Sequence, residues 1–134
     1  MKDNHPEILF TGISPRLPTT DLPRTIAFYE DVLGFRADVL WPEVDPTFCL
    51  LRRGQISLAF DRVESSVALP DATGFYIEAA DVRAMHQDLR GRVTVEWGPE
   101  VYQYGRREFA IRDPNGYMII FTEHTDDPPT CAEN

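Results

Sequence analysis

The stretch Tyr104–Phe121, YGRREFAIRDPNGYMIIF, decides the fold of this chain. At its centre, Asp113-Pro114-Asn115-Gly116 carries the residues that a type I turn prefers at its first, second and fourth positions. The Asp113 side chain can accept backbone N–H groups inside such a turn, and Pro114 sets φ at its corner. Apolar residues that favour strands lie on both sides, at 109–111 and 118–121. The sequence therefore predicts a β-hairpin.

An amphipathic helix is predicted near the start of the chain. Asp21 suits the N-cap position, and Pro23 falls in the first turn, where a missing N–H costs nothing. Gly34 is the expected C-terminal stop. Four apolar residues follow the helical period between them, namely Leu22, Ile26, Tyr29 and Leu33.

The same order of elements then repeats. A strand at 13–17, the first helix and strands at 35–41, 48–52 and 55–61 are followed by a strand at 74–79, a helix capped by Asp81, and strands at 93–97, 108–112 and 118–123. Asp81-Val82 follows Asp21-Leu22 at an offset of 60 residues. The sequence predicts one α+β domain over 1–134, with βαβββ modules at about 13–61 and 73–123, a linker at 62–72 and a flexible tail at 124–134.

The composition is that of a soluble globular protein, with 43% hydrophobic and 26% charged residues. No apolar run approaches the roughly 20 residues of a membrane span, and no long apolar leader is present, so we expect a cytoplasmic protein without a membrane partner. The net charge of −9 argues against a nucleic-acid partner. Negative charge would attract a cationic small molecule if part of it lined a cavity.

Two phrases, DLPRTIAFYEDVLGF at 21–35 and the hairpin at 104–123, resemble the vicinal-oxygen-chelate superfamily of glyoxalases, bleomycin-resistance proteins and dioxygenases. The hairpin and Ser14-Pro15-Arg16-Leu17 are most similar to the bleomycin-resistance branch. The resemblance implies that two four-stranded sheets form a cup lined by their bare faces. It also implies a homodimer that exchanges its N-terminal strand, with Pro15 at the matching place.

Enzymes of this superfamily hold a divalent metal with His, Gln or Glu side chains on the first and last strands of each module. The matching positions here are Ser14, Gly74 and Ile120, and the strand at 55–60 offers only Gln55. Such a metal needs several convergent O, N or S ligands, which Gly and Ile cannot supply. We therefore expect no metal and no other cofactor.

The ligand site is expected on the cup. Strand alternation places Tyr76 and Glu78 on the cavity side with the vacated metal positions. Glu78 could pair with a ligand ammonium or guanidinium group, and aromatic rings could stack on a flat cation. Arg106 and Arg107 alternate, so one of them should face the cavity. The predicted ligand-binding residues are Arg16, Trp41, Phe48, Tyr76, Glu78, Trp97, Tyr104 and Arg106.

The sequence thus predicts a metal-independent protein that binds and sequesters an antibiotic-type small molecule. No nucleophile–base pair or nucleophile-elbow motif is evident, so no catalytic residue is assigned. One alternative is a lyase, isomerase or dioxygenase that uses a non-standard or metal-free site on the same cup. Another is a structural or interaction module whose aromatic residues only fill a core or a dimer interface.

Overall fold

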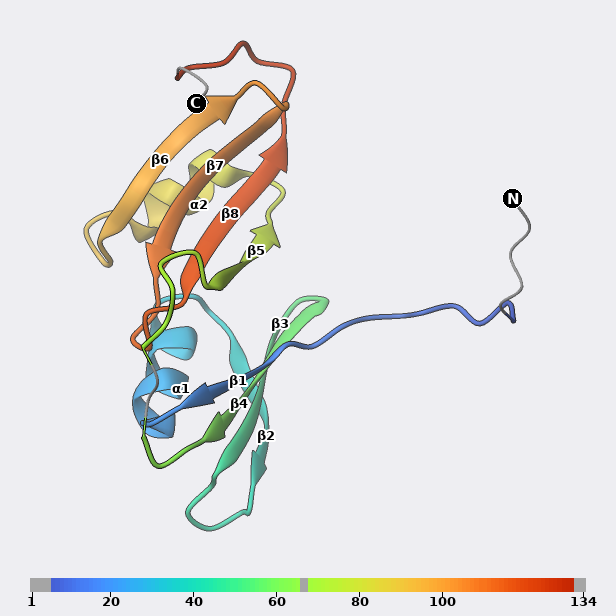
Figure 1. The fold of residues 1–134 in the computed structure, drawn as a ribbon, viewed down its shortest axis with the longest axis vertical. Helices are drawn as coiled ribbons and strands as arrows, with labels where there is room; N and C mark the ends of the chain where they lie inside the picture. The colour runs from blue at the N-terminus through green and yellow to red at the C-terminus, as the bar shows by residue number, and fades with distance from the viewer. Residues whose placement is uncertain (1–5, 66–67, 132–134) are drawn as a thin grey trace.

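The structure is a computed structural model that describes residues 6–65 and 68–131, and its strands form two separate four-stranded sheets (Figure 1). Sheet A has the order β1-β4-β3-β2, and sheet B has the order β5-β8-β7-β6. In each sheet the first strand pairs with the last one in parallel, and the other pairings are antiparallel. The elements are β1 (Arg16–Thr19), α1 (Leu22–Asp31), β2 (Arg36–Trp41), β3 (Phe48–Arg53), β4 (Ile56–Arg62), β5 (Gly74–Glu78), α2 (Val82–Leu89), β6 (Val95–Tyr102), β7 (Arg106–Arg112) and β8 (Met118–His124). The predicted α+β fold with two βαβββ modules is confirmed.

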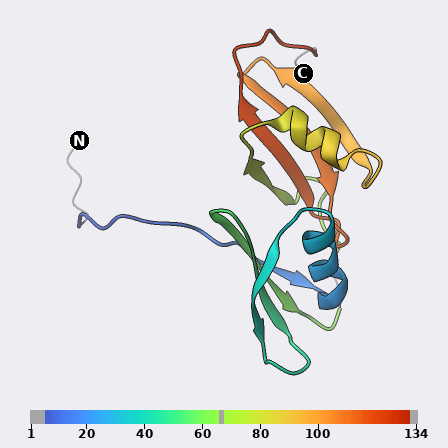
Figure 2. The ribbon, with the colours of Figure 1, turned by 180° about the vertical axis from the view of Figure 1, so that it is seen from behind.

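Each helix covers one face of its own sheet and leaves the other face open. Viewed from behind, α2 lies across sheet B, while α1 packs along one side of sheet A (Figure 2). The two modules lie one above the other, and neither sheet covers the bare face of its neighbour (Figures 1 and 2). We call these uncovered surfaces the open faces of sheets A and B. The described part of a single chain therefore presents two open faces and no closed cup.

Both helices begin as their sequences predict. The Asp21 carboxylate accepts a hydrogen bond from the Arg24 backbone N–H at 3.1 Å, and Asp81 accepts one from Ala84 at 3.0 Å. Each cap satisfies a backbone donor that has no partner inside the helix, which is worth about 1 kcal/mol. Leu22 and Tyr29 of α1 are buried against sheet A.

The hairpin turn forms as predicted. Asp113 Oδ1 accepts hydrogen bonds from the backbone N–H groups of Asn115 at 2.8 Å and Tyr117 at 3.0 Å. The Gly116 N–H donates to the Asp113 carbonyl at 3.0 Å, and Gly116 has a φ of 92°, a left-handed value that favours glycine. The turn joins β7 to β8 in a register that places Phe109 opposite Phe121.

The same turn docks module 2 onto module 1. The Tyr29 hydroxyl donates to Asp113 Oδ2 at 2.9 Å, and the Tyr117 hydroxyl donates to the Pro18 carbonyl at 2.9 Å. Burial raises the pKa values of both Tyr29 and Asp113. The rings of Phe60 and Tyr117 approach to 6.3 Å, and the buried apolar residues of both modules form one cluster. The modules are therefore joined through this packed, hydrogen-bonded junction.

Several segments differ from the boundaries that the sequence predicts. The first strand begins at Arg16 instead of residue 13, and residues 6–13 form an arm that projects from the body (Figure 1), whereas Ser14 and Pro15 bond Ser57 and Ala59 of β4. β6 continues to Tyr102 instead of ending at Trp97, because shifts in register on both sides of Trp97 absorb the irregular Gly98-Pro99 segment. His124 belongs to β8, and the Thr130 N–H bonds the Val101 carbonyl at 2.9 Å, so the described part of the tail lies against sheet B.

The two helices contain ten and eight residues, and no helix in the described ranges is long and apolar enough to cross a membrane.

We predict that Tyr29→Phe lowers the free energy of unfolding by about 1–3 kcal/mol, because it deprives a buried carboxylate of a hydrogen bond. Urea denaturation monitored by circular dichroism measures the change. Tyr76→Phe is the matched control, since Tyr76 is largely exposed, and it should change the same quantity by less than about 0.5 kcal/mol. Equal losses in the two variants would contradict the role given to the Tyr29–Asp113 bond.

Candidate functional site

The open face of sheet B gathers most of the predicted ligand-binding residues. The strand register places Tyr76 opposite Ile120, and Thr122 opposite both Glu78 and Glu108. These side chains therefore share one face of the sheet, away from α2. Arg106 lies two residues before Glu108 on β7 and has the same orientation.

Aromatic rings line the end of this face where β6 turns into β7. Tyr102 and Tyr104 are stacked, with ring centroids 5.5 Å apart and planes 4° from parallel. Trp97 meets Tyr102 edge to face at 6.1 Å. Tyr104 remains 59% exposed, and Tyr76 on β5 is 64% exposed. The result is a broad aromatic surface that is open to solvent.

A chain of polar contacts crosses the same face. The Tyr104 hydroxyl donates to Glu108 Oε1 at 2.6 Å, and the Thr122 hydroxyl donates to Glu108 Oε2 at 2.8 Å. Arg106 Nε donates to Thr122 Oγ1 at 3.0 Å, and an Arg106 terminal nitrogen lies 3.4 Å from Glu78 Oε1. Partial desolvation, followed by the hydrogen bond and the negative charge of Glu108, raises the pKa of the Tyr104 phenol. Tyr104 is therefore a protonated donor over the whole neutral range.

Arg106 and Arg107 take opposite sides of sheet B, as their alternation requires. Arg106 joins the polar chain on the open face, whereas Arg107 is buried and contacts Glu123 at 3.0 Å and Asp127 of the tail. Arg106 is therefore the member of the pair that can meet a ligand there.

The remaining predicted residues lie on sheet A. Arg16 forms an ion pair with Asp61 on the neighbouring strand. Trp41 and Phe48 are cross-strand neighbours at the ends of β2 and β3, and Trp41 is 66% exposed. The eight predicted residues thus form two groups, three on sheet A and five on sheet B, which the single chain does not bring together.

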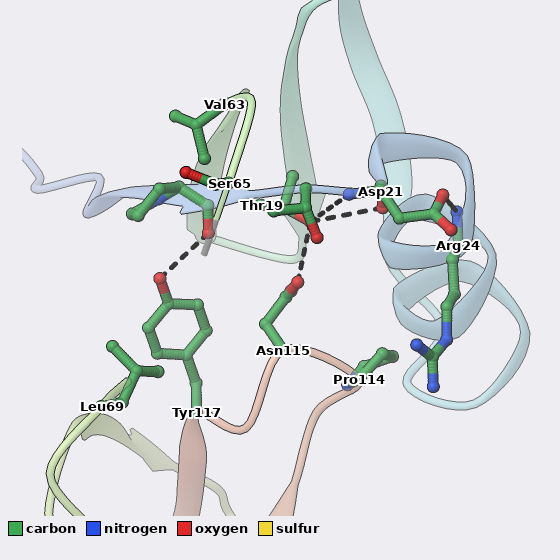
Figure 3. Close-up of a pocket in the computed structure, with 11 residues that line it drawn as sticks. Thr19, Asp21, Arg24, Val63, Ser65, Leu69, Pro114, Asn115 and Tyr117 are labelled. Carbon is green, nitrogen blue, oxygen red and sulfur yellow. Dashed lines mark hydrogen bonds between the residues drawn. The ribbon is translucent and has the colours of Figure 1, made fainter. Parts of the chain in front are cut away.

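A cavity of about 330 Å³ lies at the junction of the modules (Figure 3). Thr19 contacts Asn115 at 2.7 Å across it, and Tyr117 closes one side. Its polar groups largely bond one another, which indicates a role in joining the modules. A second cavity of about 320 Å³ borders the β3–β4 turn and includes Glu78. Neither cavity includes Trp41, Phe48 or the exposed tyrosines.

The residues at the superfamily's metal positions do not fit a metal ion. Ser14 bonds the hydroxyl of Ser57, and Ile120 offers only hydrocarbon. A Cβ at Gly74 would lie 1.9 Å from the Met118 carbonyl oxygen, so no side chain can project from this position. Within residues 6–65 and 68–131, no group of three or more His, Cys, Asp or Glu side chains could hold a metal.

The residues of the open face of sheet B that were not predicted as site residues include Tyr102, Glu108 and Thr122. Glu108 alternates in phase with Arg106, so strand parity could have placed it on this face. Its burial could not have been predicted from the sequence, because it depends on the ring of Tyr104 and the hydroxyl of Thr122.

Two βαβββ modules, each with one sheet face left open by its helix, define the class of fold to which this chain belongs. The chain belongs to the Glyoxalase/Bleomycin resistance protein/Dioxygenase superfamily, whose family model matches residues 8–121. The resemblance seen in the sequence is thereby confirmed. A comparison with curated proteins found no match.

Solved structures with the same fold include antibiotic-binding proteins. A bleomycin-binding protein from bleomycin-producing Streptomyces verticillus, complexed with copper(II)-bleomycin, is 31% identical, with a TM-score of 0.69 over 90% of this chain and 99% of that one. TnmS3, an antibiotic-binding protein from Streptomyces sp. CB03234, is 23% identical, with a TM-score of 0.70 over 90% and 100%. A bleomycin-binding protein complexed with bleomycin is 22% identical, with a TM-score of 0.67 over 84% and 97%. The last two establish the fold alone.

We predict that Gly74→Ala lowers the free energy of unfolding by roughly 2–4 kcal/mol, because the added methyl group forces β5 away from β8. Gly12→Ala is the control, since a Cβ there meets no atom within 4 Å. Thermal unfolding of both variants measures the difference. A Gly74→Ala protein as stable as its parent would show that the two strands separate easily at this point.

Proposed function

We propose that this protein binds a flat, cationic, antibiotic-type small molecule and sequesters it without breaking any bond. The observation that carries this proposal is the solvent-exposed aromatic surface on the open face of sheet B. Stacking and cation–π contact on such rings suit a planar cation, and the few polar groups beside them can fix its orientation. The bleomycin-binding protein that is 31% identical supports the same kind of ligand.

The proposed binding does not use a metal held by the protein. This part of the proposal is supported by Gly74 and Ile120, which offer no ligand atoms at the superfamily's metal positions. Sequestration of an antibiotic protects a cell when the binder meets the drug near its target. We therefore place the protein in the cytoplasm and assign it a role in antibiotic resistance.

The proposed active form is a homodimer that exchanges its N-terminal arm. Four large apolar side chains of the arm are exposed in the single chain, namely Ile8, Leu9, Phe10 and Ile13. Exposed apolar groups in this number mark a surface that binds a partner. In the dimer, the open face of sheet A from one chain would meet the open face of sheet B from the other. This arrangement would bring the two groups of predicted residues into one cleft.

Bleomycin should stabilise the protein in a thermal-shift assay. A ligand at 100 times its dissociation constant adds about 2.7 kcal/mol to the free energy of unfolding. The test compares copper-free bleomycin with copper(II)-bleomycin. Tyr76→Ala and Tyr104→Ala should each reduce the shift, because they remove exposed rings of the aromatic surface.

Leu69→Ala is the control for the position of the bleomycin site, since Leu69 lines the junction cavity instead of an open face. It should leave the shift unchanged. A shift that depends on Leu69 and not on the tyrosines would move the site to the junction. The absence of any shift would remove bleomycin as a ligand.

Size-exclusion chromatography with light scattering should show a dimer at micromolar concentration. A variant in which Ile8, Leu9 and Phe10 are replaced by Ser should elute as a monomer, because the arm would lose the apolar area that holds it on the partner. Gly12→Ala is again the control, since it changes the arm without removing apolar surface. A monomeric parent protein would contradict the proposed exchange.

A further inference from the structure

Glu108 is an unusual residue for the middle of an open sheet face. It lies within β7, yet only 4% of it is exposed. Both of its oxygens accept hydrogen bonds from neutral hydroxyl groups, those of Tyr104 at 2.6 Å and Thr122 at 2.8 Å. No Lys, Arg or His side chain of the described ranges forms an ion pair with it. The carboxylate is thus buried without a cation.

The nearest cation on this face is already engaged. Arg106 directs one nitrogen to Thr122 and another toward Glu78 at 3.4 Å. The Glu78 side chain is 80% exposed, so water and salt screen its charge, and Arg106 offsets what remains. Glu78 is therefore a weaker source of negative potential than Glu108, although the sequence predicts that it could pair with a ligand cation.

The Glu108 carboxylate forms no ion pair within the described part of the fold, and unlike Asp113 it accepts no hydrogen bond there from a backbone N–H group. Its desolvation is costly, and apolar replacements of buried charges are often neutral or stabilising. The two hydroxyl bonds recover part of that cost. They also fix the hydroxyl end of Tyr104, whose ring stacks on Tyr102 with one side open to solvent. Glu108 is therefore linked directly to the aromatic surface through Tyr104.

We propose that Glu108 is the positioning residue of the ligand site: it holds the Tyr104 ring in place and sets the preference of that surface for cations. This inference rests on the proposed function and names the determinant of its selectivity. The carboxylate accepts a hydrogen bond from the Tyr104 phenol, which keeps its proton. This bond raises the electron density on the ring and strengthens its cation–π attraction. A planar aromatic cation stacks on the side of Tyr104 that Tyr102 leaves open, near the carboxylate bonded to the Tyr104 hydroxyl, whereas a neutral molecule of the same shape gains only the stacking.

The test uses two probes of the same shape and different charge, N-methylacridinium and acridine, at about pH 8, where acridine is neutral. Fluorescence titration of the parent protein should show tighter binding of N-methylacridinium. Glu108→Gln should weaken the cation roughly tenfold and leave acridine within about twofold. Glu30→Gln on α1 makes the same change of net charge in the other module and should alter neither affinity.

A second variant and a second measurement keep the test decisive if Glu108→Gln folds poorly. Tyr104→Phe breaks the same hydrogen bond from the other side and retains Glu108, so it should weaken both probes while preserving a preference for the cation. Subtracting the ultraviolet absorbance titration of Tyr104→Phe from that of the parent protein gives the titration curve of the Tyr104 phenol. In Glu108→Gln the pKa of Tyr104 should fall toward the ordinary tyrosine value.

Each outcome supports or overturns one statement. Equal weakening of both probes in Glu108→Gln, or an unchanged Tyr104 titration, would overturn the role of Glu108 and leave the proposed binding function intact. Failure of N-methylacridinium to bind the parent protein would overturn the selectivity and count against the binding function as well. In that case the ultraviolet titration still decides whether Glu108 positions Tyr104.

Discussion

The carboxylate of Asp113 is the interaction on which the rest of the structure depends. One oxygen organises the turn between β7 and β8, and the other receives the hydroxyl of Tyr29 from the opposite module. A module of about 50 residues buries too little surface to be stable alone, so the modules need this attachment. Burial of the carboxylate is unfavourable by itself, which raises its pKa, and the donors around it make the burial tolerable only in the docked arrangement. The Asp113 carboxylate thus fixes both the local geometry of the turn and the placement of the two sheets.

The docking of the modules through Asp113 determines which sheet faces are covered and which stay open. Each helix takes one face of its sheet, and the two faces that remain open carry the candidate site. Alternation along the strands then decides which residues face solvent: Arg106 faces the open side and Arg107 faces the tail. Because the docking of the modules leaves both faces uncovered, the surface available for binding consists of side chains that the core does not need. The aromatic ring of Tyr76 can therefore vary with little effect on stability, whereas the Tyr104 hydroxyl also supplies a hydrogen bond to the buried Glu108 carboxylate.

The sequence was sufficient for the parts of the fold that rest on local chemistry. The caps at Asp21 and Asp81 and the turn at Asp113 need only residues within a few positions, and the structure confirms them. The extent of β6 was not predictable, because its continuation past Gly98 depends on pairing with β7. For the candidate site, parity placed Tyr76 on the open face, but the buried position of Glu108 arises from neighbours on another strand and in a turn.

The close approach of β5 and β8 at Gly74 limits what chemistry can evolve on this scaffold. In metal-using members of the superfamily, a side chain stands at the corresponding position. Here the Met118 carbonyl oxygen occupies the space that its first carbon would need. Substitution of His or Glu at Gly74 and Ile120 would therefore not create a pair of metal ligands. The backbone of β5 would have to shift first, so a metal site at these positions requires a change in strand geometry before any change in ligand residues.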